Sequence, residues 1–106
     1  MAPPVTEARL LEEILALAAR RGVYAVHVPD SRRVRGEPGF PDLFLAGPMA
    51  AAAWELKTVG GNLSRHQLRW KYRLEAAGIR YCMIRPADLS NGLVDFEMAS
   101  LITQPR

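Results

Sequence analysis

The segment from residue 39 to residue 57 constrains the fold of this chain most, because it contains two short β-compatible stretches separated by a Gly47-Pro48 turn. Pro41 fixes its own φ and biases the preceding residue toward extended geometry, so we expect Asp42 to enter a strand. The spacing therefore predicts an antiparallel hairpin closed near the Gly-Pro turn.

The second stretch, residues 51–57, contains two side chains of opposite charge near its end. Successive side chains of a strand alternate between faces, so Glu55 and Lys57 share one face. The hairpin would bring Asp42, at the start of the first strand, beside Glu55, near the end of the second. Two carboxylates and an ammonium group are then expected in one small volume.

This trio suits the binding of a hard divalent cation. Mg²⁺ takes oxygen ligands, usually one or two carboxylates with waters and substrate phosphates, and a nearby lysine supplies a point charge for a phosphate or an attacking water. The alternative is that Asp42 is a turn residue and that Glu55 and Lys57 form a cross-strand pair on a solvated face.

The surrounding residues favour the first interpretation. The chain resembles the VRR-NUC (virus-type replication-repair nuclease) family of the PD-(D/E)XK nuclease superfamily from about Glu7 to Ile84. The resemblance rests on Gly39-x-Pro41-Asp42, Glu55-Leu56-Lys57, Gly60-Gly61-Asn62-Leu63-Ser64-x-x-Gln67, on Trp70, Leu74 and Gly78, and on an upstream Glu7-Ala8-Arg9-Leu10.

The resemblance implies an α/β restriction-endonuclease-like core and a nuclease that depends on Mg²⁺ or Mn²⁺. The implied catalytic residues are Asp42, Glu55, Lys57 and Gln67. The implied metal ligands are Glu7, Asp42, Glu55 and the carbonyl of Leu56. The resemblance also implies a homodimer that acts on branched DNA.

Composition limits the chain to one globular domain, residues 1–106, with a single modest core. Hydrophobic residues make up 49% and charged residues 24%, which excludes a disordered chain. The net charge of +3 and pI of about 9.5 are compatible with a polyanionic partner such as DNA.

The single cysteine, Cys82, excludes an internal disulfide and a cysteine-based zinc cluster. The sequence has no apolar run of membrane-spanning length and no start typical of a signal peptide, so we expect no membrane partner. A cytoplasmic location, in a bacterial or phage-infected cell, is the corresponding expectation.

A first helix is predicted over Glu7–Arg20, with Thr6 as its N-cap and an apolar stripe at helical spacing. Glu7 lies at the inner edge of this stripe. Its charge has two candidate partners, the helix dipole and a metal ion, and the family resemblance favours the metal or a metal-bound water.

A second helix is predicted to begin at Ser64, where Ser64-x-x-Gln67 fits a capping box that alone would explain both residues. Gln67 nevertheless falls on the inward stripe with Trp70 and Leu74. From that position it could orient a water or a phosphate.

Two groups of arginines are candidates for phosphate binding, and an ordinary solvated surface is the alternative for both. One group occupies the loop 29–38, and the other recurs every four residues on the face of the second helix opposite Gln67 and Trp70. The two groups are Arg32, Arg33 and Arg35, and Arg65, Arg69 and Arg73.

Strands are also predicted over residues 23–28 and 79–84, the latter as a central strand because it is apolar, and a last helix over 93–102. His27 and His66 have no partners at metal-ligand spacing and are expected to be structural or exposed. The element order, helix, three strands, helix, strand and a C-terminal helix, predicts a mixed sheet with flanking helices.

The sequence thus predicts a metal-dependent nuclease that hydrolyses DNA phosphodiester bonds. A non-catalytic DNA-binding or interaction module with a relic nuclease site is the alternative, and a purely structural α/β protein is a third. Loss of cleavage after substitution of Asp42 or Lys57 distinguishes the first from the other two.

Overall fold

A computed structural model describes residues 5–29, 33–58 and 60–103. The elements, in chain order, are α1 (Glu7–Arg20), β1 (Tyr24–His27), β2 (Leu43–Ala46), β3 (Ala51–Leu56), α2 (Arg65–Ala76), β4 (Arg80–Ile84), the 3-10 helix η1 (Pro86–Leu89) and α3 (Leu93–Ala99). None of the helices in these ranges is long and apolar enough to cross a membrane.

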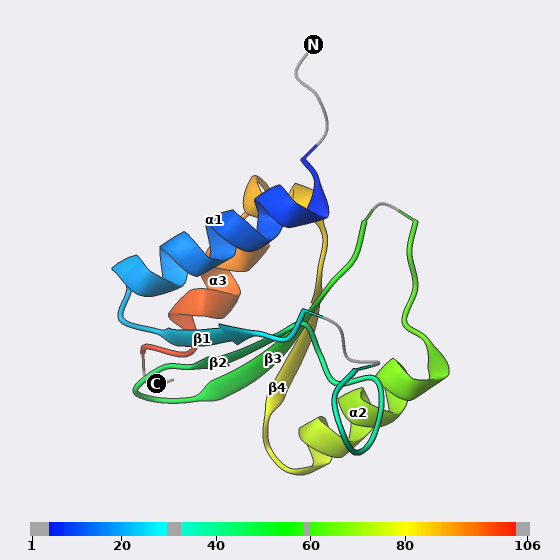
Figure 1. Cartoon of the computed structure of the whole chain (residues 1–106). Helices are drawn as coiled ribbons and strands as arrows, with labels where there is room; N and C mark the ends of the chain where they lie inside the picture. The colour runs from blue at the N-terminus through cyan, green and yellow to red at the C-terminus, as the bar shows by residue number, and fades with distance from the viewer. Residues whose placement is uncertain (1–4, 30–32, 59, 104–106) are drawn as a thin grey trace.

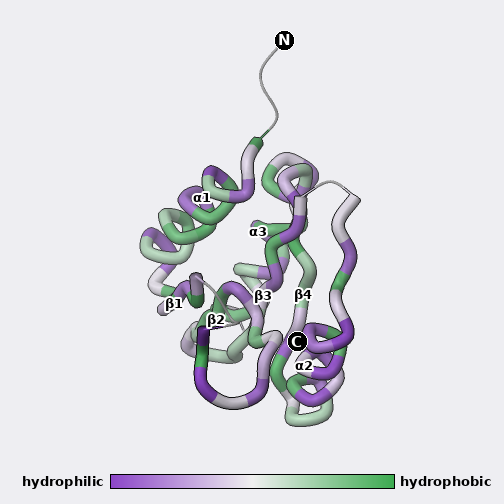
Figure 2. Tube along the Cα trace, turned by 45° about the vertical axis from the view of Figure 1, so that its right-hand side comes forward, coloured by the Kyte–Doolittle hydropathy of each residue, from purple (hydrophilic) through white to green (hydrophobic). Residues whose placement is uncertain are grey.

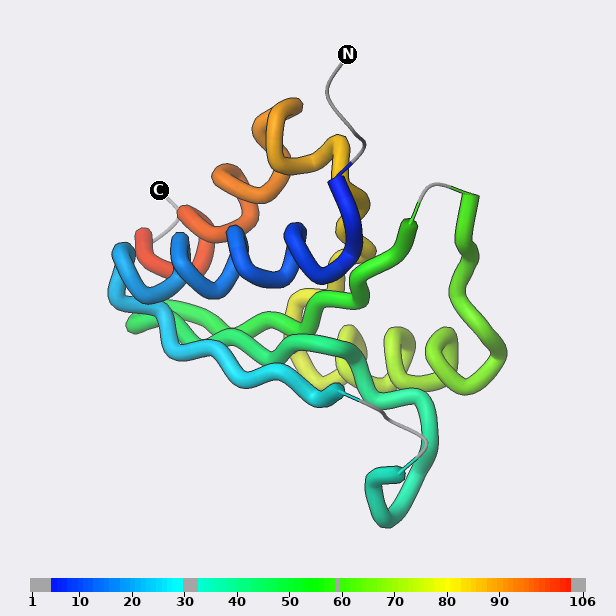
Figure 3. Tube along the Cα trace, turned by 45° about the horizontal axis from the view of Figure 1, so that its top comes forward, coloured from blue at the N-terminus to red at the C-terminus, as the bar shows by residue number. Residues whose placement is uncertain are grey.

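The four strands form one mixed sheet in the order β1-β2-β3-β4. The pairs β1–β2 and β2–β3 are antiparallel, and β3 and β4 are parallel because α2 carries the chain across between them. Helices α1 and α3 lie over one face of the sheet, and α2 lies on the other (Figures 1 and 3). The predicted α/β architecture with a mixed sheet and flanking helices is confirmed.

The core lies between the sheet and the α1–α3 layer. Its fully buried side chains include Leu10 and Ile14 of α1, Trp54 of β3 and Met98 of α3. Hydrophobic and hydrophilic residues alternate around α1 (Figure 2), as expected for a helix that buries one side. The opposite face of the sheet, toward α2, is therefore the one left for polar side chains.

Local signals in the sequence fix the two long helices. The Thr6 hydroxyl accepts a hydrogen bond from the Arg9 N–H at 3.1 Å, so α1 begins where its N-cap predicts. A capping box at Ser64 starts α2, and Gly78, with φ of +86°, follows its end.

Three predictions about the other elements need correction. β4 is an edge strand, not a central one; it is apolar because α2 packs on one of its faces and the core on the other. The last helix ends at Ala99 instead of continuing to residue 102, and η1 was not predicted. β1 begins one residue later and ends one residue earlier than expected.

Candidate active site

The β2–β3 hairpin brings Asp42 and Glu55 together. The antiparallel ladder pairs Leu43 with Trp54, so the next position outward on each strand holds one of the two carboxyl groups. Because Trp54 points into the core, Glu55 and Lys57 point to the opposite face, toward α2. The predicted hairpin and the predicted shared face are both confirmed.

Asp42 is held in place by the backbone of β3. One of its oxygens, Oδ2, accepts a hydrogen bond from the Leu56 N–H at 2.8 Å. In a strand the N–H and the C=O of one residue point to the same side, so the Leu56 carbonyl also points toward Asp42. The ladder of β2 ends at Leu43, and the carbonyl therefore lies beyond the last paired residue.

Glu55 is the one polar residue among the buried side chains of the described part of the chain, with 3% of its surface exposed. Burial raises its pKa from 4.5 to about 9, and the adjacent Asp42 carboxyl group adds to the shift. Its Oε1 atom is buried and has no hydrogen-bond partner among the described residues. In the metal-free protein Glu55 is thus protonated at neutral pH.

Lys57 and Glu7 act on Glu55 in opposite directions. The half-buried Lys57 lowers the pKa of Glu55, whereas Glu7, exposed at the first position of α1, raises it. Both charges therefore lie within electrostatic reach of the carboxyl pair.

The donor atoms at this site suit a hard cation. Within residues 5–29, 33–58 and 60–103, no three His, Cys, Asp or Glu side chains gather closely enough to hold a metal ion by themselves. Two carboxylates and the Leu56 carbonyl are nevertheless the kind of partial shell that Mg²⁺ accepts, because this ion keeps several waters and binds substrate phosphates. One candidate ligand atom is Glu55 Oε1, which is buried and has no hydrogen-bond partner among the described residues.

Gln67 serves the N-terminus of α2. Its side-chain Oε1 accepts a hydrogen bond from the Ser64 N–H at 2.8 Å, and its own N–H donates to Ser64 Oγ at 3.2 Å. The capping box predicted from the sequence is confirmed. The amide NH₂ of Gln67, which is half-buried, remains the group that a phosphate or water could contact.

Tyr81 of β4 lies on the same face of the sheet and was missed from the sequence. Its register partner is Ala53, two residues before Glu55. The Tyr81 hydroxyl is buried and has no hydrogen-bond partner within the described ranges. Burial is the main reason why the pKa of Tyr81 is raised, and the nearby Glu55 and Asp42 carboxyl groups raise it further. Period-2 alternation could have placed Tyr81 on this face, but its apolar neighbours made the strand look uniformly buried.

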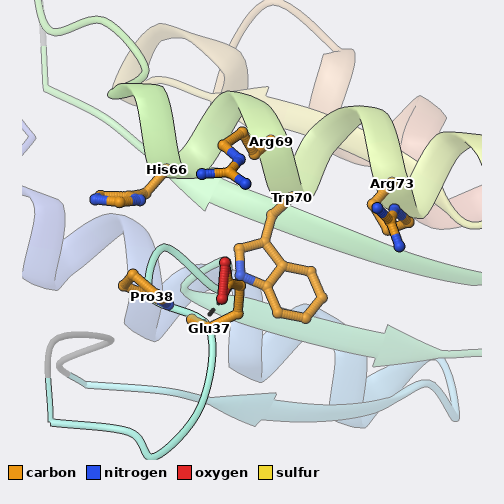
Figure 4. A pocket seen from close by; sticks show the side chains of 6 residues that line it. All are labelled: Glu37, Pro38, His66, Arg69, Trp70 and Arg73. Atoms are coloured by element: carbon orange, nitrogen blue, oxygen red, sulfur yellow. Dashed lines mark hydrogen bonds between the residues drawn. The ribbon is translucent and has the colours of Figure 1, made fainter.

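A cavity of about 320 Å³ lies between α2 and the loop before β2. Its lining includes Arg69, Trp70 and Arg73 (Figure 4), so the prediction that these arginines face away from Trp70 is wrong. Residues three and four positions apart are neighbours on a helix surface, so the arginines and the tryptophan lie on one broad stripe of α2. The described residues that line the cavity are Glu37, Pro38, His66, Arg69, Trp70 and Arg73.

The other candidate arginines lie outside this cavity. Arg33 and Arg35 are exposed in the loop before β2, and Arg65 is exposed at the first position of α2. Arg32 falls outside the described residues.

One solved structure is similar to this chain over nearly the full length of both. It is described as a "VRR_NUC domain protein" and superposes with a TM-score of 0.67, covering 96% of this chain and 98% of that chain at 17% sequence identity. No protein-family model and no curated protein matches the sequence. The likeness establishes the fold.

Proposed function

We propose that this chain, which has the VRR-NUC fold, is a nuclease that hydrolyses DNA phosphodiester bonds with the help of Mg²⁺ or Mn²⁺. The observation that supports the proposal best is the Asp42–Glu55 pair, in which one carboxylate oxygen is buried without a partner next to Lys57. A buried carboxyl oxygen without a hydrogen-bond partner is costly, which favours a functional reason for keeping it.

Asp42, Glu55 and the Leu56 carbonyl would hold the metal ion. When bound, Mg²⁺ or Mn²⁺ supplies positive charge at the scissile phosphate and lowers the pKa of a coordinated water. The Leu56 N–H keeps one Asp42 oxygen in place, so the other oxygen is presented in a fixed direction. To hold the ion as a carboxylate, Glu55 would have to release its proton to solvent.

Lys57 would position the attacking water or offset the charge that develops on the phosphate in the transition state. Glu7, from the start of α1, would contribute through a water, since it is exposed. The free amide NH₂ of Gln67 would donate to a phosphate oxygen or a water. Tyr81 would act as a positioning residue by donating a hydrogen bond, through a water, to Glu55 Oε1.

We further propose that the substrate is branched DNA, such as a Holliday junction or a flap, and that two copies of the chain act together, each cutting one strand. The expected setting is the cytoplasm of a bacterial or phage-infected cell. The arginines proposed to contact phosphates are Arg32, Arg33, Arg35, Arg65, Arg69 and Arg73. Because these contacts are ionic, the affinity for DNA should decrease as the salt concentration rises.

The test is cleavage of labelled Holliday-junction, flap and linear duplex DNA with Mn²⁺ or Mg²⁺, with EDTA as a control. Asp42→Asn and Lys57→Met should each lower the cleavage rate at least about 100-fold, the usual size of a lost electrostatic contact in a transition state. Arg20→Ala, on α1 behind the sheet, is the matched surface control and should cleave normally.

DNA binding without any metal-dependent cutting, equal in the wild type and the two site variants, would reject the nuclease. It would favour the non-catalytic binding module instead. A sedimentation experiment on the same preparation measures whether the chain is a dimer.

A further inference from the structure

The cavity beside α2 combines features that neither hydrolysis nor core packing requires. It lies outside the carboxyl pair, since neither Asp42 nor Glu55 lines it. Two arginines, a histidine and a tryptophan surround it from one stripe of α2 (Figure 4). Across from them are Glu37 and Pro38, from the loop that leads into β2.

The Trp70 indole at this cavity is held rigidly. Its Nε1–H donates a hydrogen bond to the Glu37 carbonyl oxygen at 3.3 Å. Its ring meets Phe40 edge to face, with 5.1 Å between ring centroids and 87° between planes. A ring fixed in this way is a prepared surface for a flat ligand, because little conformational freedom is lost on binding.

The arginines at the cavity have no competing partner. Arg69 and Arg73 are exposed, and the guanidinium group of neither forms a hydrogen bond or an ion pair with any residue in the described part of the chain. Arg guanidinium groups bind phosphate in a bidentate manner. Glu37 adds one carboxylate to the lining, and a carboxylate accepts hydrogen bonds from the amino groups of bases.

We propose that this cavity binds an unpaired nucleotide of the DNA substrate, an inference that rests on the proposed nuclease function. The base stacks on Trp70 and the flanking phosphates contact Arg69 and Arg73. An aromatic platform within a basic groove is how proteins hold single-stranded nucleic acid. A base within a duplex is already stacked on both faces and cannot enter.

The chain geometry places this nucleotide close to the bond that is cut. Pro38 lines the cavity and Asp42 follows four residues later, so their Cα atoms are at most about 14 Å apart. A stacked strand advances 3.4 Å per nucleotide, so the cavity lies within about four nucleotides of the carboxyl pair. The substrate class is therefore DNA with an unpaired nucleotide next to the cleavage site.

Tryptophan fluorescence tests the proposal without any cleavage. The chain has two tryptophans, and Trp54 is fully buried in the core, so a ligand at the cavity alters the emission of Trp70 alone. In EDTA, a short single-stranded oligonucleotide should quench the emission, whereas the same strand annealed to its complement should quench it far less. Trp70→Phe removes the fluorophore at the cavity, so no quenching should remain, and any quenching that does remain comes from binding near Trp54.

The cationic contribution is tested with a double variant. Arg69→Ala with Arg73→Ala should weaken oligonucleotide binding about tenfold or more and lower the slope of log affinity against log salt by about 1.4, the value for two phosphate contacts on a single strand. Arg20→Ala removes one charge from the far side of the sheet and should leave quenching unchanged. Circular dichroism confirms that each variant is folded.

The possible outcomes separate this inference from the nuclease itself. If the single strand quenches the emission no more than duplex DNA does, or if the quenching survives in Trp70→Phe, the proposed nucleotide pocket is wrong even if the protein cuts DNA. Selective quenching by single strands, lost in Trp70→Phe, supports the pocket even if no cutting is found. Cleavage mapped within about four nucleotides of an unpaired position would support both.

Discussion

Tyr81 buries a hydroxyl group beside two carboxyl groups without bonding to either. Removing a buried hydroxyl that makes no hydrogen bond costs little stability. We therefore expect Tyr81→Phe to change the free energy of unfolding in EDTA by less than about 1 kcal/mol. Its cleavage rate should fall about tenfold, because Glu55 would lose the water-mediated contact proposed above.

Urea denaturation and cleavage rates measure the two effects of Tyr81→Phe. Tyr72→Phe, on the exposed surface of α2, is the matched control and should change neither quantity. A large loss of stability in Tyr81→Phe with normal cleavage would mean that the hydroxyl is structural.

Glu55 links the stability of the metal-free protein to pH. Its pKa is about 9 in the folded state against 4.5 normally, so the folded state keeps a proton that the unfolded chain releases. The stability from this group is complete below about pH 4.5 and decreases as pH rises through about 9. In EDTA, the free energy of unfolding of wild type should decrease over this range.

Glu55→Gln should remove most of that decrease, because glutamine does not titrate. Glu12→Gln, at an exposed position of α1, serves as control and should retain the wild-type profile. Parallel profiles for wild type and Glu55→Gln, from urea midpoints at several pH values, would contradict the raised pKa.

The sequence could predict residue positions that depend on strand alternation. Asp42 was predicted to lie beside Glu55, with Lys57 on the same face as Glu55, because a hairpin with a defined turn allows only one register. The sequence also predicted the capping box that engages the Gln67 carbonyl oxygen. It could not predict that the Tyr81 hydroxyl has no hydrogen-bond partner among the described residues, because that depends on distances between elements.

Among the elements, α2 is positioned over the site by a close backbone approach. Gly39 has φ of +94°, and a Cβ atom there would lie 2.6 Å from the His66 carbonyl carbon in the first turn of α2. Gly36 has a similar φ of +104° but open space around it. Substitutions at the two glycines therefore distinguish the cost of backbone strain, which both share, from the cost of the steric contact with α2, which only Gly39 has.

Gly36→Ala should cost only the strain, about 1–3 kcal/mol of unfolding free energy. Gly39→Ala should cost about 1–3 kcal/mol more and should lower cleavage, because α2 must move away from Asp42. Thermal unfolding and cleavage assays of both variants measure this difference. Equal losses in the two variants would mean that the contact with α2 has no energetic importance.

Element boundaries followed the sequence where local chemistry sets them. Caps and helical periodicity gave the limits of α1 and the start of α2. The place of β4 at the edge was mispredicted because a parallel strand covered on both faces is apolar wherever it lies in the sheet. The cavity joins residues 37–38 to α2, more than twenty-five positions later, and local patterns carry no signal for such a contact.

For the whole molecule, the proposed metal site predicts stabilisation by divalent ions. A ligand that binds only the folded state adds about 2.7 kcal/mol at a concentration of 100 times its Kd. Mn²⁺ should therefore raise the Tm of the wild type, and EDTA should reverse the increase. Asp42→Asn should keep a normal Tm in EDTA, because its amide oxygen can still accept the hydrogen bond from the Leu56 N–H, but should lose the response to Mn²⁺. An equal response in both proteins would place the ion elsewhere.

Helix α2 contains no fully buried residue, whereas the strands that present Asp42 and Glu55 are anchored in the core by Leu43 and Trp54. Mutations on α2 therefore encounter weak constraint from folding, while mutations near the carboxyl pair encounter strong constraint. On the proposed function, substitutions on α2 would change which DNA is bound and would leave the proposed hydrolytic site intact. A laboratory library at Arg69, Trp70 and Arg73 would use the same separation to alter the preference for DNA substrates.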